Sequence, residues 1–110
     1  MDSSLYNARL AQSTENYKDM FFWMIKFVKE NKDHNSQARL LFAEALTKHL
    51  KFLLESWRIV SLKEKLVLQK GEADHAKAAA WYREKIIEKE LKEVNDVATS
   101  ALQSMILAAN

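Results

Sequence analysis

The stretch KHLKFLLESWR, residues 48–58, sets the problem that the rest of the sequence has to answer. Read as a helix at about 100° per residue, it carries one apolar stripe made of Leu50, Leu53, Leu54 and Trp57. A second apolar stripe, formed by Phe52 with Leu41 and Ile59, lies roughly half a turn away. Because one stripe is enough to bury a helix against its own domain, the second stripe needs another covering.

Glycine and proline are almost missing from the chain, which has one Gly and no Pro in 110 residues. Because these residues punctuate turns and interrupt helices, their near absence predicts long helices. The hydrophobic content of 48%, with 29% charged residues, is typical of a folded chain, and the length suits one domain. We therefore expect a single all-α domain over residues 1–110.

The charge balance and the apolar segments exclude several classes of partner. Seventeen basic against fifteen acidic residues give a net charge of +2, too small to predict a nucleic-acid surface or a polybasic membrane anchor. The most apolar window, residues 20–28, is interrupted by Lys26 and is far shorter than the ~20 residues of a membrane span. The N-terminal MDSS lacks signal-peptide features, and the absence of Cys excludes thiol chemistry. We expect no nucleic acid, no membrane and a cytoplasmic location.

Four helices are expected, over about residues 3–15, 17–32, 36–70 and 72–108. Asn35 or Ser36 can cap the third helix, and Gly71 supplies its C-terminal stop. On the fourth, Glu88 is expected to pair with Lys92 at i,i+4. The pattern predicts an antiparallel bundle of four helices with two long C-terminal helices. Two short helices cannot cover a hairpin of two long ones along its whole length, which is the first indication of a second copy.

Several motifs occur together at specific positions: LAQSTENYKDM (10–20), SWRIVS (56–61), WYREKI (81–86) and NDV (95–97). Together with the spacing from Met24 through Arg39 to Trp57, and with Gly71 between the long helices, they resemble the N-terminal half of 14-3-3 proteins. The resemblance covers essentially all 110 residues, as the first four helices of that family.

The resemblance implies a symmetric dimer, in which the first helix crosses to the partner and packs on its third and fourth helices. The positions that match this contact are Leu10, Thr14, Tyr17, Ser56, Val60, Tyr82 and Lys85. Asp19 matches an acidic residue that pairs across the dimer with the position of Lys85, whereas Asn16 stands where the family carries a basic residue of another pair. The implied partner is a second copy of this chain.

The resemblance fails at the family's phosphate site. The family grips a phosphoserine with basic side chains of its third and fifth helices, but the matching positions on the third helix are Thr47 and Leu54. Leu53 also replaces a basic residue, and the sequence stops before the fifth helix. A phosphate dianion needs charge-assisted donors, which neither a Thr hydroxyl nor a Leu provides. Loss of phosphopeptide binding is therefore predicted.

These departures predict a non-enzymatic dimerisation module, either a redesigned scaffold or a degenerate natural relative. Leu53 and Leu54 are expected to form an exposed apolar patch unless the chain repacks into a closed bundle or two chains cover each other. Trp81 is a second candidate for an exposed contact. The alternative is a monomeric or dimeric bundle with an internal apolar cavity that binds a small molecule. The side chains that would line it are aromatic: Phe21, Phe22, Trp23, Phe27, Phe52 and Trp57.

Two spacings resemble chemical sites without completing them. Glu72 and His75 have the Glu-x-x-His spacing of di-iron bundles, but the second such motif is missing, so we expect no metal and no cofactor. His49 and Ser56 lie seven residues apart on one helical face, but no orienting acid or oxyanion site accompanies them. Polar groups at a subunit interface explain this second pair better, and no catalytic residue is predicted.

Overall fold

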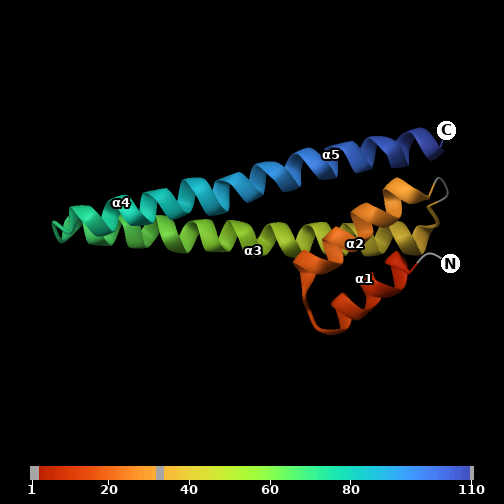
Figure 1. The fold of residues 1–110 in the computed structure, drawn as a ribbon, viewed down its shortest axis with the longest axis horizontal. Helices are drawn as coiled ribbons and strands as arrows, with labels where there is room; N and C mark the ends of the chain where they lie inside the picture. Colours follow the sequence, from red (N-terminus) through yellow and green to blue (C-terminus); the bar gives the residue numbers. More distant parts are fainter. Residues whose placement is uncertain (1–2, 32–33, 110) are drawn as a thin grey trace. The chain divides into compact units, whose positions relative to one another are not determined.

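The computed structural model describes residues 3–31 and 34–109, which contain helices and no strand (Figure 1). The elements are α1 (Ser4–Ser13), α2 (Tyr17–Glu30), α3 (Ser36–Gln69), α4 (Ala73–Tyr82), the π-helix η1 (Arg83–Glu88) and α5 (Lys89–Ala109). Because α4, η1 and α5 follow one another without a break, they make the second of two long helices. The predicted all-α fold of four helices, two of them long and C-terminal, is confirmed.

The chain forms two compact units. Unit 1 comprises Met1–His49 and Asn95–Asn110, and unit 2 comprises Leu50–Val94. The single domain over residues 1–110 stays a prediction.

In unit 1, a tight turn joins α1 to α2. Glu15 adopts a left-handed backbone conformation with φ of 56°, which allows the N–H of Asn16 to donate to the carbonyl of Ala11 at 2.9 Å. Asn16 then caps α2, because its Oδ1 accepts from the N–H of Asp19 at 3.2 Å while its Nδ2 donates to the Asp19 carboxylate at 2.9 Å. The side chain at position 16 thus fixes where the second helix begins.

The core of unit 1 is built mainly from α2 and the first turns of α3. The buried apolar side chains are Ala8, Met20, Phe21, Met24, Ile25, Val28, Ala38, Leu41, Phe42, Ala45, Ala98 and Ala101. The rings of Phe21 and Phe42 lie 6.1 Å apart between centroids. As predicted, Asn35 caps α3, with its Oδ1 accepting from the N–H of Ala38 at 2.8 Å. A hydrogen bond of 2.5 Å from Gln12 to Glu44 joins α1 to α3.

In unit 2, the chain reverses direction at Gly71 to form an antiparallel helical hairpin (Figure 1). Gly71 has a φ of 79°, its N–H donates to the carbonyl of Leu68 at 3.1 Å, and the N–H of Glu72 donates to the carbonyl of Val67 at 2.9 Å. This pair of bonds is a Schellman motif, which needs a residue that tolerates positive φ. The predicted stop at Gly71 is therefore confirmed.

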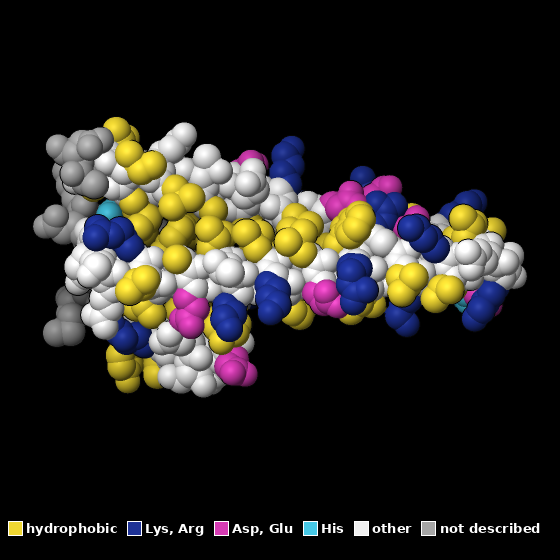
Figure 2. All heavy atoms as spheres, turned by 180° about the vertical axis from the view of Figure 1, so that it is seen from behind, with side chains coloured by type: hydrophobic (Ala, Val, Ile, Leu, Met, Phe, Trp, Pro, Cys, Tyr) yellow, Lys and Arg dark blue, Asp and Glu magenta, His cyan; other side chains and the backbone are white. Residues whose placement is uncertain are grey.

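The core of unit 2 is small relative to its apolar content. Its buried apolar side chains are Leu53, Ala76, Ile87 and Val94. Its exposed large apolar side chains are Phe52, Leu54, Trp57, Ile59, Leu62, Leu66, Leu68, Trp81, Tyr82 and Ile86. Figure 2 shows hydrophobic side chains reaching the surface between basic and acidic ones on the face drawn. Unit 2 thus leaves much apolar surface on α3 uncovered.

Candidate functional site

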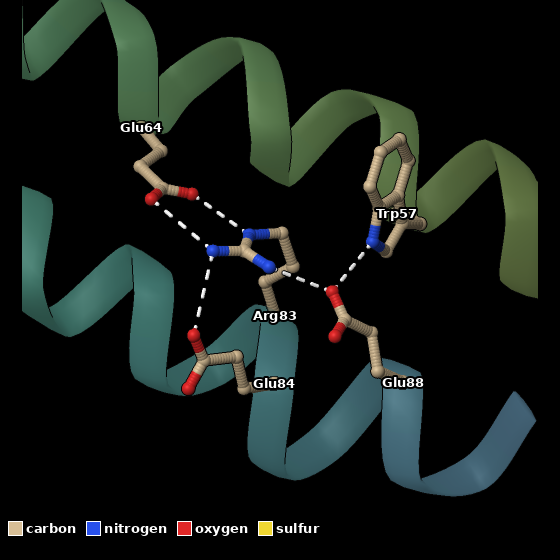
Figure 3. Close-up of polar contacts among 5 residues, drawn as sticks. All are labelled: Trp57, Glu64, Arg83, Glu84 and Glu88. Carbon is tan, nitrogen blue, oxygen red and sulfur yellow. Dashed lines mark hydrogen bonds and ion pairs between the residues drawn. The ribbon is translucent and has the colours of Figure 1, made fainter. Parts of the chain in front are cut away.

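The polar centre of unit 2 is Arg83, at the start of η1 (Figure 3). Its Nε donates to Oε2 of Glu64 at 2.8 Å and its Nη2 donates to Oε1 of the same carboxylate at 3.3 Å. Its Nη1 donates to Glu88 at 2.7 Å, and Glu84 lies 3.6 Å from Nη2. A bidentate Arg–carboxylate pair of this kind fixes geometry as well as charge, so Arg83 ties α3 to η1.

Trp57 completes this network from α3, because its Nε1 donates to Oε2 of Glu88 at 2.8 Å. The hydrogen bond from Trp57, followed by the one from Arg83, holds the pKa of Glu88 below its ordinary value of 4.5. Hydrogen bonds from Arg83 likewise lower the pKa of Glu64, and both carboxylates raise the pKa of Arg83 above its ordinary range. Glu64, Glu88 and Arg83 are therefore all charged at neutral pH.

Sequence reasoning missed this network because it assumed ordinary helical geometry. At about 100° per residue, Arg83 and Glu88 would point about 140° apart. A π-helix closes its hydrogen bonds between residues five apart, which brings such a pair onto nearly the same face. The expected partner of Glu88, Lys92, is thus replaced by Arg83 and Trp57. The remaining signal, an Arg with several Glu within reach, is too common to single out a site.

A hollow of about 480 Å³ lies beside this network, entirely within unit 2. Its lining residues are Trp57, Arg58, Ser61, Leu62, Glu64, Lys65, Leu68 and Arg83. All but Arg83 come from α3, so the hollow follows the surface of that helix. Arg58 is held by Glu55 through two hydrogen bonds of 3.2 and 2.5 Å, which lower the pKa of Glu55.

The predicted dimer positions lie on the surfaces of the two units. On α1 and α2, Leu10, Thr14 and Asp19 are exposed and Tyr17 is half-buried. On α3 and α4, Ser56 and Val60 are half-buried and Tyr82 is exposed, and Lys85 of η1 is exposed too. None of these eight side chains is buried within the chain. Their contact with a second copy stays a prediction.

One of the candidates for an exposed contact is buried and the others are exposed. Leu53 is only 3% exposed, so its predicted role as an exposed apolar contact is wrong: of the stripe Leu50, Leu53, Leu54 and Trp57, Leu53 alone is buried in the core. Leu54, one residue further and about 100° round the helix, is 57% exposed, and Thr47 is exposed as well. Trp81 is exposed, and its role in a contact stays a prediction.

The alternative of an internal aromatic cavity is not supported. Phe22 is 60% exposed and Phe52 is 67% exposed, so neither can line an enclosed cavity. Phe22 instead packs edge-on against Trp23, with 5.3 Å between ring centroids, and Trp57 serves the polar network. Within one chain these two side chains therefore line no enclosed cavity, and the small-molecule alternative stays a prediction.

The residues of the two incomplete chemical motifs have ordinary structural roles. The Ser56 hydroxyl donates to the carbonyl of Phe52 at 2.9 Å, within its own helix, and His49 is buried with its ring 5.9 Å from that of Phe21. His75 and Glu72 are solvent-exposed and lie 3.5 Å apart at the start of α4. Within residues 3–31 and 34–109, no three His, Cys, Asp or Glu gather as a metal site would require. Over the same ranges, the helices are too short or too polar to cross a membrane.

Comparison with known proteins places these features in a family. Residues 7–110 match the family model described as 14-3-3 protein. A 14-3-3-like protein of Solanum tuberosum is 31% identical over 107 residues, covering 96% of this chain and 41% of the relative. The 14-3-3-like protein GF14 chi of Arabidopsis thaliana is 32% identical over 110 residues, covering 98% of this chain and 41% of the relative. The human 14-3-3 protein eta is 31% identical over 103 residues, covering 94% of this chain and 42% of the relative. The chain thus spans about two fifths of the length of the curated relatives it matches, and it belongs to the 14-3-3 family.

Proposed function

We propose that this chain is a non-enzymatic protein-interaction module that forms a symmetric homodimer through α1, α3 and α4 and does not bind phosphopeptides. A cytoplasmic location, and an origin as a redesigned scaffold or a degenerate natural relative, belong to the same proposal.

The observation that carries the proposal is the apolar surface of unit 2. Apolar side chains left in water favour association, and a monomer rarely exposes a large contiguous patch of them. In unit 2, the exposed large apolar side chains outnumber the buried ones, and on α3 they include Phe52 and Ile59, which flank the predicted contact position Ser56 at i−4 and i+3. A second copy whose α1 carries the exposed Tyr6 and Leu10 supplies a matching apolar face.

The loss of phosphopeptide binding follows from the chemistry at two positions. A phosphate dianion needs several cationic donors that converge on one point. Thr47 and Leu54, at the positions that the family uses on this helix, are both exposed and carry no charge. A neighbouring cation, Lys48, lies with its Nζ 5.5 Å from the ring centroid of Tyr17 instead.

A charge-swap experiment tests the proposed dimer. In a symmetric dimer, Asp19 of each copy faces Lys85 of the other, so Asp19→Lys places two cations together twice, and Lys85→Asp does the same with two carboxylates. Each variant alone should dissociate more readily, by about tenfold in Kd. An equimolar mixture restores attraction at both contacts and should form a heterodimer, detectable by native mass spectrometry.

The mixture also controls for damage to the fold. Asp19 takes part in the cap of α2, so Asp19→Lys alone can lower the stability of the fold for a reason unrelated to dimerisation. Selective heterodimer formation cannot come from that damage. Equal association of both variants with themselves and with each other contradicts the proposed interface.

Calorimetric titration with a phosphoserine peptide tests the proposed loss of phosphopeptide binding. It should give no saturable heat, and micromolar binding contradicts that part of the proposal.

A further inference from the structure

Two pairs of neighbouring aromatic side chains lie at the surface of α2 and α4. On α2, the exposed Phe22 packs edge-on against the half-buried Trp23, with 5.3 Å between ring centroids. On α4, Trp81 is 57% exposed and Tyr82 is 48% exposed. We call these pairs the α2 aromatic pair and the α4 aromatic pair. Rings of this size lose more water-exposed apolar area on contact than most side chains, so both pairs are suited to binding another molecule.

The indole of Trp81 stands out among the tryptophan side chains. Trp57 is hydrogen-bonded to Glu88, and Trp23 lies under Lys26, whose Nζ is 5.3 Å from its ring centroid. Among residues 3–31 and 34–109, the Trp81 side chain takes part in no hydrogen bond, ion pair or ring contact. The fold of the single chain therefore gives this exposed ring no role.

Both aromatic pairs lie one helical turn from the charge pair of the proposed dimer. Trp23 follows Asp19 by four residues, and Trp81 precedes Lys85 by four residues. Residues four apart lie on the same face of a helix, about 6 Å apart along its axis. When Asp19 of one copy meets Lys85 of the other on helices that run in opposite directions, Trp23 therefore comes opposite Trp81.

The charges favour opposite directions for the two helices. If α2 and the other copy's α4 ran in the same direction, Trp23 and its neighbour Lys26 would come opposite Lys89, four residues after Lys85. Lys26 and Lys89 are both exposed, so two ammonium groups would be brought together. Opposite directions bring aromatic rings together instead, and such rings attract each other beyond the area that they bury.

We propose that the α2 aromatic pair of each copy packs on the α4 aromatic pair of the other copy, beside the contact between Asp19 and Lys85. In a symmetric dimer this aromatic contact forms twice. It selects a second copy of this chain as the partner, because this chain carries both aromatic pairs at matching distances from the charge pair. A partner that lacks either pair binds less tightly.

This inference rests on the proposed function, because it assigns further side chains to the proposed dimer. The aromatic residues can be changed without touching Asp19 or Lys85. The aromatic contact can therefore fail its test while the dimer itself remains.

Single substitutions measure what each ring contributes. Phe22→Ala and Trp81→Ala each truncate an exposed side chain, so neither removes a core residue. Each variant loses a ring from both aromatic contacts, and its dimer Kd should rise about tenfold. Leu40→Ala, which truncates an exposed side chain outside the predicted contact positions, should leave the Kd within about twofold. Sedimentation equilibrium measures the constants.

Mixing the two aromatic variants shows whether the rings meet across the dimer. In the mixed dimer, Phe22→Ala and Trp81→Ala fall in the same aromatic contact, and the other contact keeps all of its rings. In each unmixed dimer, both contacts have lost a ring. If the rings touch, the two losses are not additive, so the mixed dimer should exceed the half expected by chance in native mass spectrometry.

The outcomes separate the aromatic contact from the dimer. A dimer whose Kd is the same in the original chain and in all three variants overturns this inference and leaves the proposed dimer standing. Chance proportions in the mixture have the same meaning. A monomer at every concentration of the original chain overturns both proposals.

Discussion

Nε1 of Trp57 donates a hydrogen bond of 2.8 Å to Oε2 of Glu88, and the same oxygen accepts one of 2.7 Å from Nη1 of Arg83. One carboxylate oxygen thus joins the indole of α3 to the guanidinium of η1 (Figure 3). Because unit 2 buries few apolar side chains, this polar contact matters more for holding its hairpin together than it would in a large core.

The indole N–H can be removed with little change in shape. Trp57→Phe keeps an aromatic ring but loses the hydrogen bond to Glu88, so the pKa of Glu88 should rise toward its ordinary value of 4.5. The midpoint of urea unfolding should fall as well. Carbon-detected NMR titration of the Glu88 carboxyl group measures the pKa. An unchanged pKa would mean that Arg83 alone sets it.

The carboxylates bonded to Arg83 predict how stability depends on pH. The folded-state pKa values of Glu64 and Glu88 lie below 4.5, so the stabilisation that they provide is fully present above pH 4.5. This stabilisation is lost as the pH falls through the folded-state pKa values, because the unfolded chain binds more protons than the folded chain in that range. Urea unfolding measured between neutral pH and pH 3 should show this decline.

Replacing both acids gives the control. The double variant Glu64→Gln, Glu88→Gln should be less stable than the original chain at neutral pH. Its free energy of unfolding should also fall less steeply below pH 4.5. The exposed Glu93→Gln should leave the curve as it is. If all three curves run parallel, the network does not contribute to the acid dependence.

Much of the fold could be predicted from local signals, but the site could not. Asn35 and Gly71 mark the ends of α3 because capping depends on the residue type at one position. The burial of Leu53, next to the exposed Leu54 of the same stripe, depends on which face of α3 the returning helix covers, and periodicity alone does not define that face so narrowly. The pairing of Arg83 with Glu88 depends on a π-helical turn, for which the sequence offers no distinctive pattern.

The turn before α2 contains a residue in an unfavourable conformation. Glu15 has a φ of 56°, where a side chain with a Cβ costs about 1 kcal/mol relative to glycine. Glu15→Gly removes that strain but adds freedom to the unfolded chain, so we expect a net stabilisation of about 0.5 kcal/mol in the free energy of unfolding. Chemical denaturation measures it. A loss of more than about 0.5 kcal/mol, outside the usual range for a surface substitution, would contradict the assigned backbone conformation.

Two neighbouring positions on α3 test the core of unit 1. Phe42 is buried against Phe21, whereas Leu40 is exposed on the other side of the helix. Phe42→Ala should lower the free energy of unfolding by about 3–5 kcal/mol, through lost apolar burial and the cavity left behind. Leu40→Ala should change it by less than about 0.5 kcal/mol. Similar losses at the two positions would mean that α3 presents a different face to the core.

Sedimentation equilibrium across micromolar concentrations shows whether a second copy covers the apolar surface of this 14-3-3 family chain. We expect a species of twice the chain's 12.8 kDa. Leu10→Asp should shift it toward monomer, whereas Leu107→Asp should not, because Leu107 is also exposed but lies outside the predicted interface. A particle of 12.8 kDa at every concentration would contradict the proposed dimer.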